Sequence, residues 1–162
     1  MASKASIFGH PIHPMIIPFP FALWMFSLAA DVMYLWRGND HWGLAAFYTL
    51  AAGLLGGVVA AIPGIIDWLA IKDREVVRIA NWHARLNVIA IIVFAIDFYL
   101  RWRSLGRIPK EGVSLPLMLS VLGVILISIS GWLGGDLSYK HGVGVAPQHD
   151  TPEEEVAKGR FS

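Results

Sequence analysis

The chain has 162 residues, of which 56% are hydrophobic and 15% are charged. A soluble domain carries about 25% charged residues, and a small one has too little interior to hide this much apolar surface. The composition therefore excludes an ordinary soluble protein and predicts a membrane protein with the lipid bilayer as its main partner. The net charge of +1 gives no indication of a nucleic-acid partner, and the lack of cysteine excludes disulfides and cysteine-ligated metal sites.

Four apolar segments are long enough to cross a bilayer, which takes about 20 helical residues. We place them at about 15–36, 44–69, 84–102 and 115–133. Tryptophan prefers the headgroup level and lies near almost every end of these segments. One side of the membrane is marked by Trp36, Trp42 and Trp102, and the other by Trp68, Trp82 and Trp132.

Short connections at about 38–43, 70–82 and 103–114 make consecutive helices antiparallel neighbours. The prediction is an all-α, integral membrane four-helix bundle with up-down-up-down topology and both termini on one side, named the near side here. Residues 1–14 form an N-terminal segment, 15–136 the membrane domain, and 137–162 a polar, disordered tail. Two GxxxG pairs, Gly53 with Gly57 and Gly131 with Gly135, favour close helix packing. We detect no internal repeat.

Lysine and arginine are distributed unevenly between the two sides of this bundle, with eight on the near side and five on the far side. These residues accumulate in the cytoplasmic loops of membrane proteins. We therefore expect a multi-pass protein of the inner (plasma) membrane with cytoplasmic termini.

Histidines and carboxylates gather on the near side. His10 and His13 each precede a proline, which keeps the preceding residue extended, so both imidazoles are ordered ahead of the first helix. Imidazole and carboxylate ligands suit Fe, Zn, Mn or Cu, and two opposed histidines suit haem b. The candidate cofactor-binding residues are His10, His13, His83 and His141, and the candidate metal ligands are these four with Asp67 and Asp136.

Two other interpretations stay open. The histidines also fit the solvated helix ends of a non-catalytic membrane anchor or subunit. Inside the spans, Asp31 and Asp97 need a partner or water, because an unpaired carboxylate in lipid is costly. Asp97 either forms an ion pair with Arg101, one helical turn away, or serves with Asp31 in a proton- or ion-coupled carrier.

Four stretches carry a resemblance to a known family: HPIHP at 10–14, GIIDW at 64–68, WHARLN at 82–87 and GGDLSYKHGVGV at 134–145. With these stretches the chain resembles a family of small bacterial four-helix membrane proteins catalogued only as a domain of unknown function. The resemblance covers nearly everything from Gly9 to Val145, and relatives usually carry Glu at the position of Asp136.

The resemblance implies a fold and a location but no reaction. Some relatives carry a Rieske-type iron–sulfur domain after the bundle, which implies electron-transfer partners for the fold. We therefore expect a metal- or haem-binding protein in a redox or electron-transfer role. Its expected protein partners are a redox protein or further copies of the chain.

Overall fold

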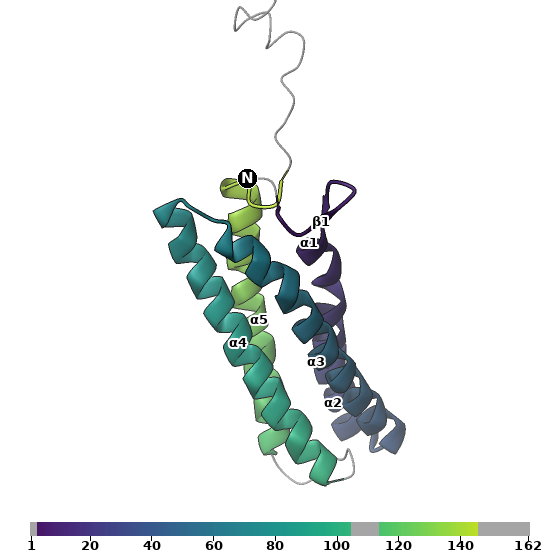
Figure 1. The fold of residues 1–162 in the computed structure, drawn as a ribbon. Helices are drawn as coiled ribbons and strands as arrows, with labels where there is room; N and C mark the ends of the chain where they lie inside the picture. The colour runs from purple at the N-terminus through teal and green to yellow at the C-terminus, as the bar shows by residue number, and fades with distance from the viewer. Residues whose placement is uncertain (1–2, 105–113, 146–162) are drawn as a thin grey trace, which may run out of the picture.

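The computed structural model describes residues 3–104 and 114–145, in which four long helices form a bundle (Figure 1). The long helices are α2 (Pro18–Arg37), α3 (Asp40–Leu69), α4 (Arg74–Arg103) and α5 (Leu115–Gly135). Each is long and apolar enough to cross a membrane. The described chain begins and ends at the same end of the bundle, so the predicted all-α fold, its topology and its near side are confirmed.

Short elements cover the near-side end. Strands β1 (Ser6–Ile7) and β2 (His10–Pro11) form an antiparallel hairpin, which leads into the short helix α1 (Ile12–Ile16). A π-helical turn, η1 (Asp136–Lys140), continues α5. Leu137 of this turn is buried against Val76 and Ala80 of α4. The polar tail predicted from residue 137 therefore starts with packed structure, and residues 146–162 lie outside the described residues.

Helix α4 begins well before the expected third span. The Asp73 side chain accepts hydrogen bonds from the backbone N–H groups of Glu75 and Val76, which is the ordinary N-cap arrangement. Most of the expected loop at 70–82 is consequently helical. The apolar pattern missed the first two turns of the helix, because Arg74, Glu75, Arg78 and Asn81 interrupt their apolar residues.

The bundle consists of two helix pairs with equivalent contacts. Trp24 of α2 packs on Gly53 of α3, and Phe94 of α4 packs on Gly123 of α5. Phe94 lies 70 positions after Trp24, and Gly123 lies 70 positions after Gly53. The same separation relates Asp31 to Arg101, which bind each other. The expectation of no internal repeat is therefore wrong at the level of structure. Few equivalent positions carry the same residue, which hid the repeat in the sequence.

Where the two helix pairs meet, some residues contact their own counterparts in the repeat. Trp24 stacks on Phe94 with ring centroids 4.4 Å apart, and Arg101 binds Asp31. In a two-fold arrangement, a residue that contacts its own counterpart lies at the axis. Because α2 and α4 both run from the near side to the far side, this pseudo-two-fold axis runs across the membrane.

Only one of the two predicted GxxxG pairs lies at a packed position. A Cβ atom at Gly53 would lie 2.6 Å from the Trp24 ring, and one at Gly57 would lie 2.7 Å from it. At Gly131 the nearest side-chain atom would be 4.0 Å away, and at Gly135 nothing lies within 4 Å. The second pair is therefore not a packing motif in this fold, and Gly123 takes the role opposite Phe94.

Replacement of Gly53 or Gly123 by Ala is expected to destabilise the bundle by about 1–3 kcal/mol, the usual cost of overpacking a core. The new methyl group at Gly123 would lie 2.5 Å from the Phe94 ring. Thermal unfolding in detergent measures the effect. Gly135→Ala is the matched control on the same helix and is expected to keep the native transition; equal transitions for Gly123→Ala and Gly135→Ala would contradict the packing argument.

Candidate two-histidine site

Two half-buried histidines from different halves of the bundle lie side by side near the near-side end. His13 comes from α1 and His83 from α4, and their ring centroids are 6.4 Å apart with the ring planes at 89°. His83 lies nine residues after Arg74, the first residue of α4, whereas the sequence predicted it at the start of the third helix. The two histidines are also counterparts in the internal repeat, so this site lies at the pseudo-two-fold axis.

Each imidazole is fixed by a main-chain carbonyl of a neighbouring helix. Nδ1 of His13 lies 2.7 Å from the carbonyl oxygen of Ala60, and Nδ1 of His83 lies 2.8 Å from that of Ser130. Both bonds span 47 residues, as the repeat requires. Because a carbonyl oxygen only accepts hydrogen bonds, each Nδ1 carries the proton and donates it.

Two glycines let the imidazoles reach these carbonyls. In a helix, the side chain of residue i+4 lies beside the carbonyl of residue i. That position is Gly64 for Ala60 and Gly134 for Ser130, and a Cβ atom there would lie 2.7 Å from His13 or 3.1 Å from His83. The site thus needs a histidine, an accessible helix carbonyl and a glycine in each half.

With the proton on Nδ1, Nε2 is the ring nitrogen that can offer a lone pair to a partner. Asn87 approaches Nε2 of His83 with its amide nitrogen at 3.1 Å, and the same nitrogen donates to the His83 carbonyl at 3.0 Å. Metal-binding histidines are likewise held at one ring nitrogen by a carbonyl. At His83 a metal ion would have to displace the Asn87 amide from Nε2.

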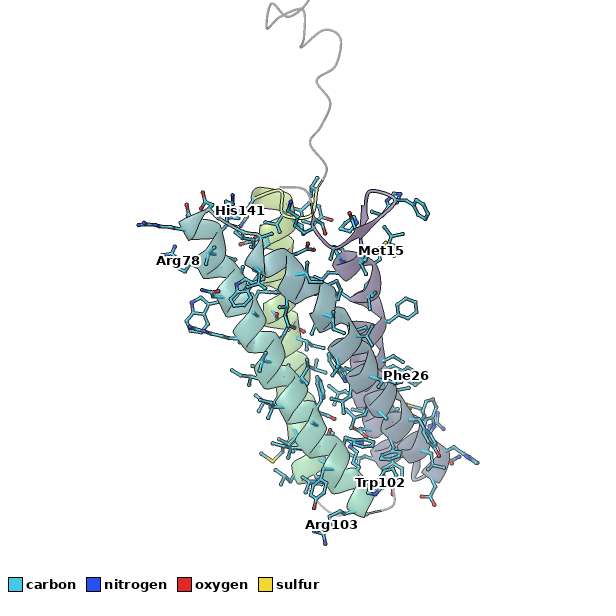
Figure 2. All side chains as sticks on the ribbon, viewed as in Figure 1. Met15, Phe26, Arg78, Trp102, Arg103 and His141 are labelled. Atoms are coloured by element: carbon cyan, nitrogen blue, oxygen red, sulfur yellow. The ribbon has the colours of Figure 1, made fainter. Side chains whose placement is uncertain are left out.

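The structure does not bring the other four predicted ligands into this pair. The Asp67 carboxylate accepts hydrogen bonds from the Lys4 and Ala5 backbone and from the Ser3 hydroxyl, and so fastens the N-terminal segment to α3. Asp136 forms an ion pair with Lys140 at 2.8 Å. His10 is exposed on β2, and His141 follows η1 at the near-side end that Figure 2 shows opposite Trp102 and Arg103.

Within the described ranges, 3–104 and 114–145, no group of three or more His, Asp or Glu side chains is placed to hold a metal ion. The pair His13 and His83 is therefore the part of the predicted six-residue set that the fold brings together.

A second polar cluster lies toward the far side. The Arg101 guanidinium binds Asp31 through two nitrogens, at 2.6 and 2.7 Å, and its Nε binds Asp97 at 2.8 Å. Ser120 of α5 accepts from Arg101 at 2.9 Å and donates to Asp97 at 2.8 Å. The predicted ion pair between Asp97 and Arg101 is confirmed, and Arg101 also reaches across to Asp31 on α2.

Sequence reasoning missed Asn87, Ser130 and the glycines Gly64 and Gly134. A signal was present, since a small residue precedes each glycine by four positions, at Ala60 and Ser130. Small residues are common in membrane helices, however. Without the fold this spacing does not single out a site.

Loss of the Arg101 side chain is expected to cost more stability than neutralising one carboxylate. Arg101→Ala leaves Asp31 and Asp97 buried without their cation, and breaking such a buried pair costs about 3–5 kcal/mol. Asp97→Asn keeps the two-nitrogen bond between Arg101 and Asp31 and should lose much less. Chemical or thermal unfolding in detergent compares the two variants, and an Arg101→Ala protein as stable as Asp97→Asn would refute this role.

Comparison with known proteins agrees with the fold and location. The model of a family described as "Predicted membrane protein (DUF2231)" matches residues 9–147. Searches of curated proteins and of solved structures gave no match. The matched region contains both histidines, both glycines and all four long helices. The chain therefore belongs to this family of predicted membrane proteins.

Proposed function

We propose that the protein binds a redox-active metal centre, haem b or a single transition-metal ion, through His13 and His83. One observation carries the proposal: two adjacent imidazoles, one from each half, are both held at Nδ1 by a carbonyl. Holding Nδ1 in this way leaves Nε2 as the nitrogen that would bind the iron or metal ion, at His83 after displacement of the Asn87 amide.

The number of ligands favours haem over a lone ion. A haem iron needs at most two axial ligands from the protein, whereas a structural zinc takes four. A single Fe, Zn, Mn or Cu ion would require further ligands, for which His10, His141, Asp67 and Asp136 are the nearby candidates on the near side. Recruiting Asp67 or Asp136 would require breaking its present hydrogen bonds or ion pair.

A redox role also agrees with the resemblance to relatives that carry a Rieske-type domain. The centre would then exchange electrons with a separate redox protein, because a bundle with one such centre contains no second carrier of its own. The carrier interpretation is less favoured, because Asp31 and Asp97 both bind Arg101. The alternative from a different class is a non-catalytic membrane anchor or subunit, in which the two histidines only join the halves.

The protein purified in detergent from cells supplied with haem precursors and trace metals is expected to retain one centre per chain. Haem gives intense visible absorption that changes on reduction, and elemental analysis detects a colourless ion. His13→Ala and His83→Ala should each abolish or strongly reduce retention, because each removes one of two ligands. His41→Ala, exposed at the start of α3 on the far side, is the matched control and should retain the centre.

Loss of retention counts only where the variant keeps the elution volume and helical signal of the native protein. A native protein that is colourless, metal-free and unable to take up haem or any of the four metals would refute the proposal. The anchor interpretation would then be preferred.

We further propose that the near side is cytoplasmic and the membrane is the inner (plasma) membrane, from the lysine and arginine distribution. A reporter fused after Ser162 is expected to show cytoplasmic activity, and one inserted between Arg103 and Ser114 to show external activity. The reverse pattern would overturn the orientation and leave the bundle unaffected.

A further inference from the structure

The N-terminal hairpin carries an aromatic residue in an unusual conformation. Strands β1 and β2 pair Ser6 with Pro11 and Ile7 with His10, so Phe8 and Gly9 alone form the turn. Both turn residues have positive φ, 50° at Phe8 and 80° at Gly9. Tight hairpin turns of this kind favour Asn or Gly at the first position, and a bulky aromatic residue is rare there. Local backbone preference therefore does not explain Phe8.

Packing within the chain does not explain Phe8 either. Its side chain is 98% exposed, and the preceding Ile7 is 56% exposed. A soluble surface rarely offers adjacent large apolar side chains at the tip of a loop unless something outside the chain covers them.

The hairpin lies next to the near-side end of the first candidate membrane span, Ile12–Arg37. It precedes α1 directly, and Figure 2 places Met15 of α1 at this end of the bundle. Met15 and Phe19, which follow in the chain, are 60% and 70% exposed within this candidate span. Exposed apolar side chains therefore recur along the chain from the hairpin tip into the candidate span.

The hairpin is also held firmly at its base and carries a suitable charge. Asp67 binds the backbone of Lys4 and Ala5, and the Ala5 carbonyl accepts from the Ile12 backbone N–H at 2.9 Å. Residues 3–20 contain no carboxylate of their own, and the exposed Lys4 offsets the charge of Asp67 at the base of the hairpin. Anionic headgroups would therefore meet no net negative charge from these two side chains.

We propose that Ile7 and Phe8 insert into the near-side leaflet, so that the hairpin is a lipid-binding anchor. Transfer of both side chains from water to the boundary between headgroups and acyl chains provides the favourable free energy that the turn conformation lacks. The hairpin backbone keeps its own hydrogen bonds, which suits it to this layer. The anchor is independent of any metal or haem and would hold the segment that carries His13.

The lack of cysteine allows a direct test. Single-cysteine variants Phe8→Cys and Ile7→Cys are spin-labelled and reconstituted into phosphatidylcholine–phosphatidylglycerol vesicles. Collision rates with oxygen, which partitions into lipid, are compared with those of a water-soluble nickel complex. Ile92→Cys, exposed midway along α4, is the lipid control, and Lys72→Cys, exposed in the near-side connection before α4, is the water control.

The expected ratio of oxygen to nickel collisions at positions 7 and 8 is several-fold above that at Lys72 and close to that at Ile92. Ile7→Cys retains Phe8. Its label therefore measures whether the hairpin tip lies in lipid even if Phe8→Cys, which lacks the aromatic ring, no longer inserts. Water-like values at both positions would overturn the proposal. The exposed surface of Ile7 and Phe8 would then be assigned to a partner protein, which the vesicles do not contain.

Discussion

Arg101 is the residue on which the assembly of the two halves depends. Its guanidinium is completely buried and binds a carboxylate on its own helix, a carboxylate on α2 and a hydroxyl on α5. In lipid no water replaces a lost partner, so each of these groups needs the others. This requirement fixes the relative positions of three helices and makes the polar cluster a joint between the halves.

The internal repeat gives this joint its place in the bundle. The two helix pairs meet along a line of counterpart residues that begins with the histidine pair, continues through Trp24 and Phe94, and ends at Asp31 and Arg101. Each half supports its own residues in the same way, with a glycine beneath the aromatic ring and another beneath the imidazole. The candidate site is therefore part of the interface between the halves.

Divergence between the halves explains why the repeat escaped sequence reasoning. Gly57 leaves room for the indole of Trp24, whereas its counterpart Ile127 is a buried member of the core cluster that contains the smaller ring of Phe94. At the far-side joint the counterparts are opposite in charge, because two like charges meeting at an axis would repel. Packing and charge pairing both require unlike residues at these positions, so the symmetric backbone carries an asymmetric sequence.

The sequence by itself determined the four helices, their topology and the common side of the chain ends, because lipid selects long apolar segments and short loops make neighbours antiparallel. It also offered the ion pair of Asp97 and Arg101, which lie one turn apart, as one of two interpretations, and the structure confirmed that one. Only the tertiary structure decided which near-side groups meet. It joined His13 to His83 and assigned Asp67 and Asp136 to local contacts, because side-chain partners depend on the rotation of each helix and on where a missing Cβ opens a carbonyl.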